Sequence, residues 1–300
     1  MIPVLFFVSL ITFTIMHLTP GGPFDRERRI PDSVRANIER KYGLDQPFIV
    51  QYLSYIGGAV QGDLGPSFRD PRRSISEILA GGFPVTVQLG LQALVLGVIV
   101  GIPIGIIAAL KQNTWVDYLG VGFSVGGYSV PSFVLAILLI LVFSVTLHLL
   151  PTNGWNGPIN WIMPTVALAT GPAAILARYT RSSILDVVRQ DYVRTARAKG
   201  IVERLVVVRH MLPNALIPVV TVIGPLAAAL VTGSFIIETV FQVPGIGRLF
   251  VSGVSERDYP MIMGTTLVYA VIVAVFNLVV DVVYVLIDPR IQFSSSNSRG

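Results

Sequence analysis

Long apolar runs separated by short polar segments make up most of this chain. Several runs reach about 18 residues or more, the length at which an α-helix crosses a hydrocarbon core about 30 Å thick. We therefore expect an all-α polytopic membrane protein with six transmembrane helices. The third run is too long for one perpendicular crossing, so we expect it to tilt or to turn near Gly126 and Gly127. The expected spans cover residues 2–18, 84–110, 119–150, 161–177, 215–241 and 261–287.

Positive charges in the short loops predict the orientation of these spans, because Lys and Arg are retained on the cytoplasmic side. Eleven such residues lie on one side, in segments 111–118 and 178–214 and in the tail. The short loops of the other side have two, both in segment 242–260. Segment 20–83 also lies on that side, but its nine basic residues are nearly matched by eight acidic ones, and at 64 residues it reaches the length where the rule loses force. Both termini and segment 178–214 are therefore predicted to be cytoplasmic. The predicted parts are a first helix (1–19), an extracytoplasmic insertion (20–83), a five-helix core (84–288) and a cytoplasmic tail (289–300).

Segment 20–83 carries helical signals of its own, so we expect a small helical insertion after the first span. Val34, Ile38 and Tyr42 recur at helical spacing. A second short helix is expected to open at Gln46-Pro47 and to close at Gly57-Gly58. The insertion is either a cap packed on the membrane exit or a docking surface for an external partner. The residues considered for docking are Tyr42, Gln46, Tyr52 and Asp63.

Prolines and two acids, Glu238 and Asp281, interrupt the apolar runs. A proline inside a span frees a backbone carbonyl that lipid cannot satisfy, so such breaks favour close helix packing or a wet pathway. A carboxylate inside a span is costly and usually faces a cavity or a partner. Glu238 lies close to the outer end of its span, so a path role and a contact with water or an arginine both stay open. The candidate path residues are Pro131, Pro172, Pro225 and Glu238.

A stripe of glycines marks the second span. Gly97, Gly101 and Gly105 recur every fourth residue and allow another helix to approach closely. The partner helix belongs either to the same chain or to a second subunit. The sequence alone leaves both alternatives open.

The composition and the absence of several motifs narrow the function. Hydrophobic residues make up 53% of the 300 residues and charged residues only 13%, and the chain has no cysteine. Soluble domains carry about 25% charged residues. The chain lacks the Walker A phosphate loop and the G-x-S-x-G and H-E-x-x-H motifs, and no two histidines share a helix face at ligand spacing. We therefore expect no catalytic residue, no bound metal and no directly bound cofactor.

The charged segment 190–218 is the most distinctive polar stretch in the second half of the chain. Asp191 at one end and Arg197 and Lys199 at the other complement the dipole of a short helix. Gly200 is suited to end that helix. A basic loop merely kept inside would explain the charges but not the glycine or the small side chains. The small side chains that keep the helix narrow enough to enter a cleft are Thr195, Ala196 and Ala198.

Motifs along nearly the whole chain carry a family resemblance. They are His17–Gly21, Tyr42–Pro47, Gln51-Tyr52, Gly62–Gly65, Pro84–Thr86, Glu238–Phe241, Pro244–Gly247, Asp281–Tyr284 and Asp288–Arg290. With them the chain resembles the inner-membrane permease subunit of peptide-type ABC importers. It resembles the first of the two permease kinds found in oligopeptide, dipeptide, glutathione and nickel systems. The family usually continues the first motif with Asp-Pro, where this chain has Gly22-Pro23.

Segment 190–218 resembles the loop by which importer permeases engage their ATPases, with the pattern E-A-A-x-x-x-G and, ten residues on, I-x-L-P. Gly200 takes the glycine position, while Arg194 replaces the glutamate and His210 the isoleucine. Asp191 or Glu203 is a candidate to supply the contact of the missing glutamate. The residues that the resemblance assigns to ATPase coupling are Asp191, Arg194, Thr195, Ala196, Arg197, Ala198, Lys199, Gly200, Leu212 and Pro213.

The resemblance implies the type I permease fold and the transmembrane half of an ATP-driven importer for di- or oligopeptides in a bacterial inner membrane. The implied partners are a second homologous permease, two ABC ATPase subunits that bind ATP and Mg²⁺, an extracytoplasmic substrate-binding protein and the lipid bilayer. No nucleic acid is implied. The same machinery imports nickel, glutathione or haem in related systems, so these substrates stay open. The rivals from other classes are an ion-coupled secondary transporter, for which no inverted repeat is visible, and a non-transporting membrane anchor.

Overall fold

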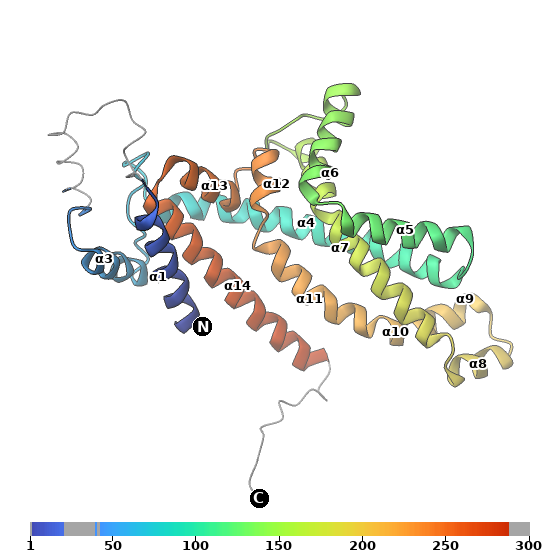
Figure 1. The fold of residues 1–300 in the computed structure, drawn as a ribbon. Helices are drawn as coiled ribbons and strands as arrows, with labels where there is room; N and C mark the ends of the chain where they lie inside the picture. Colours follow the sequence, from blue (N-terminus) through green and yellow to red (C-terminus); the bar gives the residue numbers. More distant parts are fainter. Residues whose placement is uncertain (1, 21–39, 41–42, 288–300) are drawn as a thin grey trace, which may run out of the picture. The chain divides into compact units, whose positions relative to one another are not determined.

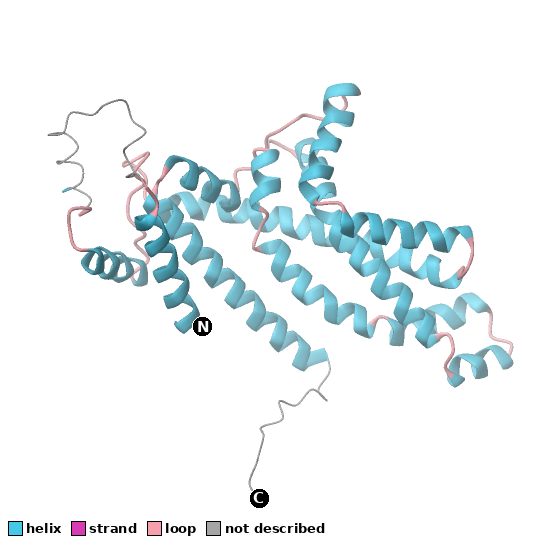
Figure 2. Ribbon diagram, in the orientation of Figure 1, coloured by secondary structure: helices cyan, strands magenta, loops and turns pink. Residues whose placement is uncertain are grey.

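The computed structural model describes residues 2–20, 40 and 43–287. Within these residues the chain is built from helices and loops, and an isolated antiparallel bridge between Pro66 and Ser74 is its β-structure (Figure 2). The all-α prediction is confirmed. The contacts divide the chain into two compact units. Among the described residues, the first comprises those up to residue 87, 153–155 and 233–274, and the second comprises 88–152, 156–232 and 275–287.

The first unit contains two short helices from the start of the chain and a cluster from its last third (Figure 1). Its apolar core joins Phe13 and Met16 to Tyr52, Ile262 and Met263. The elements are α1 (Ile2–Leu18), α3 (Phe48–Val60), the first turns of α4 (Ile75–Leu110), α12 (Phe235–Val240), α13 (Ile246–Glu256) and the first half of α14 (Tyr259–Ile287).

The second unit is organised around α7, which α5, α6, α10 and α11 contact. A π-helical turn, η1, continues α6, and a second one, η2, precedes α10. The elements are the rest of α4, α5 (Trp115–Ser129), α6 (Ser132–Leu139), η1 (Ile140–Thr146), α7 (Pro158–Val187), α8 (Asp191–Ala198), α9 (Glu203–Leu205), η2 (Val206–Met211), α10 (Leu212–Ala215), α11 (Ile217–Val231) and the rest of α14.

Three helices among the described residues are long and apolar enough to cross a membrane: α4, α7 and α14. Two bent helix pairs, 115–146 and 203–231, reach the required length and composition together. The apolar helix α1 has 17 residues. These six segments correspond in order to the six expected spans. Their boundaries differ from the expected ones. For example, α7 continues ten residues past Ala177 to Val187.

The second span begins earlier than Pro84, where the sequence analysis had placed its start. Helix α4 starts at Ile75. The Glu77 amide donates to the Ser74 hydroxyl at 3.1 Å, and the Glu77 carboxylate accepts from the Ser74 amide at 3.4 Å. This reciprocal capping box fixes the start nine residues before the proline.

The third span is broken rather than tilted. Helix α5 and the segment 132–146 meet at an angle of 102°. The expected turn at Gly126 and Gly127 is wrong, because both glycines lie inside α5. The break falls at Val130, which adopts φ −81° and ψ 119°. A residue before proline is pushed out of the helical region, so Pro131 sets the position of the break.

The fifth span is also divided. Gly233 has φ +92° and separates α11 from α12. A further bend of 52° lies between residues 203–215 and 217–231. Pro218, in the first turn of α11, has no N–H to continue the preceding helix. Segment 242–260, expected to be a loop, contains the 11-residue helix α13.

The glycine stripe of α4 packs within this chain. A Cβ atom at Gly97 would lie 3.2 Å from the Pro172 side chain, and one at Gly105 would lie 2.5 Å from the Ala177 carbonyl. A Cβ atom at Gly101 would collide with the Ala173 backbone. The stripe therefore brings the backbones of α4 and α7 together, which confirms the alternative of packing within one chain.

Candidate functional site

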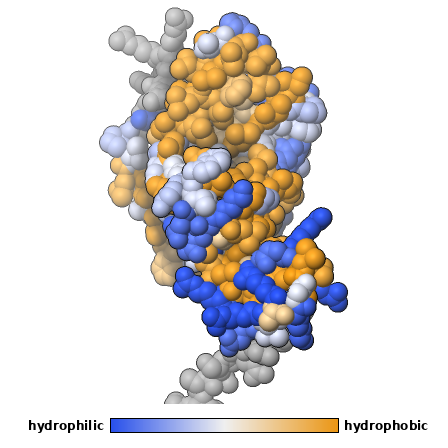
Figure 3. Space-filling view, turned by 90° about the vertical axis from the view of Figure 1, so that its right-hand side faces the viewer, coloured by the Kyte–Doolittle hydropathy of each residue, from blue (hydrophilic) through white to orange (hydrophobic). Residues whose placement is uncertain are grey.

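The predicted coupling helix is present as α8, with bounds that match the prediction. Its eight residues run from Asp191 to Ala198, and Lys199 is the C-terminal cap. The side chain of Thr195 donates back to the Asp191 carbonyl at 2.9 Å. Hydrophilic residues gather in the lower half of the face drawn in Figure 3, at whose lower end α8 and α9 lie, and mostly hydrophobic residues cover its upper half.

A Schellman motif ends α8 and explains the glycine. Gly200 has φ +74°, a conformation that costs residues with a Cβ atom about 1–2 kcal/mol. The Gly200 amide donates to the Arg197 carbonyl at 2.9 Å, and the Ile201 amide donates to the Ala196 carbonyl at 3.4 Å. These two bonds are the 5→2 and 6→1 pair of the motif. The partly buried Ile201 packs on the same apolar cluster as Ala196, a hydrophobic contact that frequently accompanies this motif.

Two residues of α8 face the rest of the second unit. Val193 is fully buried and Ala196 is 5% exposed. They pack in an apolar cluster with Ile184 of α7, Ala109 of α4 and the η2–α10 segment. Ala196 is one of the small side chains expected to keep the helix narrow enough to enter a cleft, but it lies on the buried face with Val193, because residues three apart share one face. Its small side chain instead lets α8 lie close to the cluster.

The opposite face of α8 is charged and exposed. Arg194, Thr195 and Ala198 are all exposed. Arg197 forms a bidentate ion pair with Glu203, at 3.0 Å from Nε to Oε2 and 2.6 Å from Nη2 to Oε1. The Glu203 carboxylate thereby raises the pKa of Arg197. Both carboxylate oxygens of Glu203 are thus bonded to Arg197.

Asp191 is the other candidate to supply the contact of the glutamate that Arg194 replaces, and it lies beside Arg194. Arg194 Nη1 lies 3.8 Å from Oδ1 of Asp191, and both side chains are mostly exposed. An exposed pair of this kind contributes at most about 1 kcal/mol. At the end of the coupling segment, Leu212 packs on the apolar cluster and Pro213 is exposed at the start of α10.

Glu238, a candidate path residue, is fully buried in the first unit. Its Oε1 accepts from the Thr86 hydroxyl at 3.1 Å, and its Oε2 accepts from the amides of Gly247 at 2.8 Å and Arg248 at 3.2 Å. The Thr86 hydroxyl also accepts from the Ile246 amide at 2.9 Å. The first three amides of α13 are therefore paired by two side chains from outside the helix, and the carboxylate is favoured by its dipole.

The buried hydrogen-bond network of Glu238 and Thr86 explains the glycines of the Pro244–Gly247 motif. A Cβ atom at Gly245 would collide with Glu238 Oε2 and with the Thr86 hydroxyl. One at Gly247 would lie 2.9 Å from the same carboxylate oxygen. The glycines leave room for the carboxylate to reach the helix start. In this conformation Glu238 is inaccessible to solvent, and its path role stays a prediction.

The three proline candidates lie in the second unit. Pro131 sits in the break before α6 and is exposed. Pro172 lies inside α7 against Gly97, and Pro225 lies inside α11 and is exposed. Their assignment to a path also stays a prediction.

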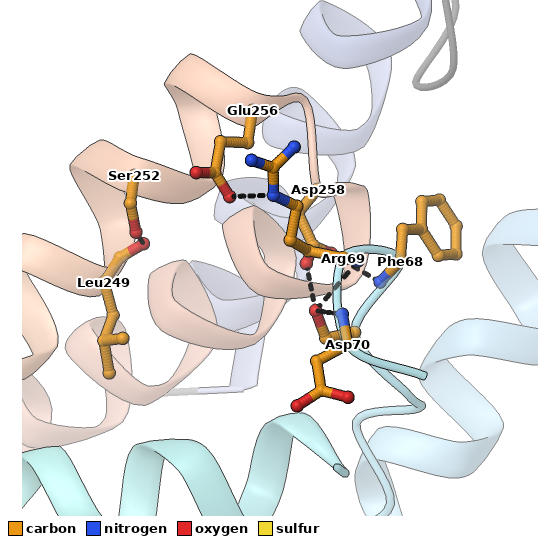
Figure 4. Close-up of polar contacts among 8 residues, drawn as sticks. Phe68, Arg69, Asp70, Leu249, Ser252, Glu256 and Asp258 are labelled. Atoms are coloured by element: carbon orange, nitrogen blue, oxygen red, sulfur yellow. Dashed lines mark hydrogen bonds and ion pairs between the residues drawn. The ribbon is translucent and has the colours of Figure 1, made fainter. Parts of the chain in front are cut away.

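A second buried carboxylate, Asp258, fixes the corner between α13 and α14 (Figure 4). It is 3% exposed and accepts from the Ser67 hydroxyl, from the Phe68 amide at 3.2 Å and from the Met261 amide at 3.2 Å. Asp258 therefore caps α14 and holds the segment at Ser67 with one carboxylate. The Arg69–Glu256 ion pair beside it, at 3.1 Å, is exposed.

Two of the four proposed docking residues lie on the surface. Gln46 and Asp63 are exposed, while Tyr42 and, apart from residue 40, the expected helix at 34–42 lie outside the described residues. Tyr52 is 4% exposed, and its hydroxyl lies 2.9 Å from that of Ser9. A docking role for Tyr52 is wrong, because it lies on the face of α3 that packs on α1.

Helix α3 extends to Val60 and includes Gly57 and Gly58. A half-open cavity of about 440 Å³ lies beside it, lined in part by Phe13, His17, Tyr55 and Asp63. Burial, with the Asp63 charge adding to it, raises the pKa of Tyr55.

The sequence analysis did not identify several residues of the buried hydrogen-bond networks around Glu238 and Asp258. Thr86 and Glu238 are 152 residues apart, and Ser67 and Asp258 are 191 residues apart. No local pattern joins such partners. The sequence carries only a weak signal for such a network, which is an acid next to a helix start. Asp258, before the apolar run of α14, is an example.

Comparison with known proteins identifies the family. Residues 101–293 match the family model described as "Binding-protein-dependent transport system inner membrane component". The chain is 47% identical over 285 residues to the dipeptide transport system permease protein DppB of Bacillus subtilis, covering 95% of this chain and 92% of that protein. It is 45% identical over 294 residues to the oligopeptide transport system permease protein OppB of Salmonella typhimurium, covering 97% and 96%.

Solved structures show the same fold at lower identity. An inward-facing structure of the MetNI methionine ABC transporter matches with a TM-score of 0.59 and 20% identity, covering 70% of this chain and 96% of that chain. An amino acid ABC transporter with histidines matches with a TM-score of 0.56 and 18% identity, covering 69% and 93%.

Broken apolar spans and an exposed charged helix packed on their ends define a multi-pass membrane permease of the type I ABC importer fold. The chain belongs to the family of binding-protein-dependent transport system inner membrane components, and within it to the peptide-type ABC importer permeases.

Proposed function

We propose that this chain forms half of the translocation pathway of an ATP-driven importer for di- and oligopeptides. The substrate class follows the names of the relatives that align over nearly the whole chain. ATP and Mg²⁺ bind to partner ATPases, and a second homologous permease forms the other half of the pathway. An extracytoplasmic binding protein delivers the peptide and docks in part on segment 20–83.

The observation that carries this proposal is the geometry of α8. Its Val193–Ala196 face is buried in the chain's own apolar cluster, while Arg194, Thr195 and Ala198 are exposed. A helix anchored on one side and open on the other suits a rigid contact with a second protein. Because α8 follows α7 after three residues, a push on α8 reaches a membrane span directly. Alternating access then follows from ATP-driven movement of α8.

Association with the ATPases tests this role of α8. The chain is co-expressed with its partner permease and ATPases, and the complex is purified through a tag on this chain. Ala198→Trp, on the exposed face, is expected to reduce the amount of co-purified ATPase. The matched control is Val202→Trp, at a position that is 73% exposed beyond the helix. Equal recovery of ATPase with both variants would contradict a docking role for α8.

Orientation is tested by labelling single cysteines, which the absence of native cysteine makes specific. We expect Gln46→Cys to react with a membrane-impermeant maleimide in intact cells. Thr195→Cys should react only after the membrane is opened or inverted. The reversed result would overturn the proposed orientation, in which both termini are cytoplasmic.

Substrate and energy source are tested in proteoliposomes that contain the complete complex and the purified binding protein. Uptake of a labelled dipeptide or oligopeptide should require ATP hydrolysis. Uptake of nickel, glutathione or haem in place of peptide would overturn the substrate class but not the importer function. Uptake by this chain alone, driven by an ion gradient, would overturn both.

A further inference from the structure

A buried ion pair joins α5 to α7 in the second unit. Arg181 Nε donates to Oδ1 of Asp117 at 2.6 Å, and Arg181 Nη2 donates to Oδ2 at 2.8 Å. The Asp117 side chain is 3% exposed and the Arg181 side chain 27%. Oδ2 of Asp117 also accepts from the Asn113 amide at 3.0 Å, in the turn between α4 and α5. The pair therefore connects the end of α7 to the beginning of α5 and to the turn before it.

The surroundings of the pair are closely packed. A Cβ atom at Gly105 of α4 would lie 3.1 Å from the Arg181 amide, and one at Gly120 of α5 would lie 2.8 Å from the Ala108 side chain. The backbones of α4, α5 and α7 thus approach each other around the pair. Ile184, three residues after Arg181 on α7, is fully buried in the apolar cluster that holds Val193 and Ala196 of α8. Contacts therefore run without interruption from α8 through α7 to α5.

Stability alone does not account for such a pair. Apolar replacement of a buried ion pair is often neutral or stabilising, whereas removal of one partner leaves an unpaired buried charge. What the pair does supply is geometry, because two parallel hydrogen bonds from a planar guanidinium fix both the distance and the rotation between two helices. Apolar side chains at the same positions form no directional bond, so they fix the rotation between the helices less strictly.

We propose that Asp117 and Arg181 are positioning residues that make α5 move together with α7 when α8 is displaced by the ATPases. This inference rests on the proposed function as an ATP-driven importer. The α5 helix is followed by the 102° break at Pro131, so a displaced α5 carries the broken third span with it. The ion pair passes the movement to a span that has no covalent connection to α8 nearby.

The test is the double variant Asp117→Leu with Arg181→Met in the reconstituted complex. Apolar replacement avoids an unpaired buried charge, so the variant complex should assemble and keep its ATPase subunits. We expect uptake per ATP hydrolysed to fall about fivefold or more, the size of a typical coupling between sites. Lys111→Met, in the adjoining turn, removes a charge without touching the pair and should keep the wild-type ratio.

A distance measurement separates positioning from a purely structural role. Spin labels are attached at Val121→Cys on α5 and Tyr179→Cys on α7, both at exposed positions of this cysteine-free chain. In the wild-type background the distance should be the same in the nucleotide-free and ATP-trapped states. In the double variant it should differ between the two states. A purely structural pair would instead lower complex yield and uptake together, with no state-dependent distance.

The outcomes distinguish failure of this inference from failure of the proposed importer function. Wild-type uptake per ATP in the double variant would overturn the inference and leave the importer function intact. A wild-type distance that changes between the two states would overturn it as well. A wild-type complex that assembles but shows no ATP-dependent uptake would contradict the proposed function, and the inference with it.

Discussion

Replacement of Glu238 tests how the start of α13 is held. In Glu238→Ala, the amides of Gly247 and Arg248 lose their shared acceptor, and the Thr86 hydroxyl loses the atom to which it donates. A hydrogen bond to a charged group contributes about 1.5–3 kcal/mol, and a buried donor left unpaired costs about 1–3 kcal/mol. Three buried donors lose their acceptor, and part of α13 can relax toward water, so we expect a loss of about 3–5 kcal/mol, in the lower half of the range for three unpaired buried donors.

Glu238→Gln is the matched variant. The two amides share one carboxylate oxygen, Oε2, and the Thr86 hydroxyl uses the other. A glutamine oxygen in the place of Oε2 keeps both amide bonds. Only the Thr86 hydroxyl then faces an NH₂ group instead of an acceptor. We therefore expect a loss of about 1–2 kcal/mol, close to one hydrogen bond.

The assay is thermal unfolding of the detergent-purified chain, followed by intrinsic fluorescence. At about 2 °C per kcal/mol for a chain of this size, Tm should fall by about 6–10 °C in Glu238→Ala and by about 2–4 °C in Glu238→Gln. The control is Glu256→Gln, which removes one partner of the exposed Arg69 ion pair and should change Tm by less than about 2 °C. If the alanine variant and the control have the same Tm, Glu238 does not hold α13.

Three further predictions concern single positions. Gly200→Ala should lower stability by about 1–2 kcal/mol through the left-handed backbone alone, because its Cβ would meet no atom within 4 Å; an unchanged Tm would contradict the Schellman motif. Gly101→Leu should prevent a monodisperse elution peak in detergent because α4 and α7 cannot approach, while Gly122→Leu, in open space on α5, elutes normally; equal profiles would refute the packing. Asp258→Asn should speed trypsin cleavage after Arg69, and an unaltered cleavage rate would mean that the carboxylate does not hold this segment.

The parts of the fold that the sequence predicts are those fixed by neighbouring residues. The bounds of α8 follow from Asp191 at its start and Gly200 after its end, and both signals act within one turn. Its buried face did not follow, because the small Ala196 is compatible with either a protein partner or the chain's own core. The orientation of a short helix about its axis depends on what packs against it, and for α8 that is a cluster drawn from four other elements.

The breaks in the spans show a second limit on what the sequence predicts about the fold. Pro131 lies at the break of the third span, yet the sequence analysis expected either a tilt or a turn near Gly126-Gly127, a few residues earlier. Both residue types interrupt helices in water, but in an apolar run glycine also serves close packing, and a Cβ atom at Gly127 would lie 3.0 Å from the Ala174 side chain. Proline has no N–H and constrains the residue before it, so it breaks this helix whatever packs nearby.

Three buried acids in the described part of the chain share a position that changes how an acid in an apolar sequence is interpreted. Asp117 lies in the first turn of α5, Asp258 caps α14, and Glu238 pairs the first amides of α13. At each of these places the helix dipole and unpaired amides favour a negative charge, which offsets part of the cost of its burial. An acid in an apolar run therefore indicates a helix start nearby as well as a transport path. In this permease the helix start is the interpretation that the contacts support, and each of these acids also binds a second segment distant in sequence or belonging to another helix.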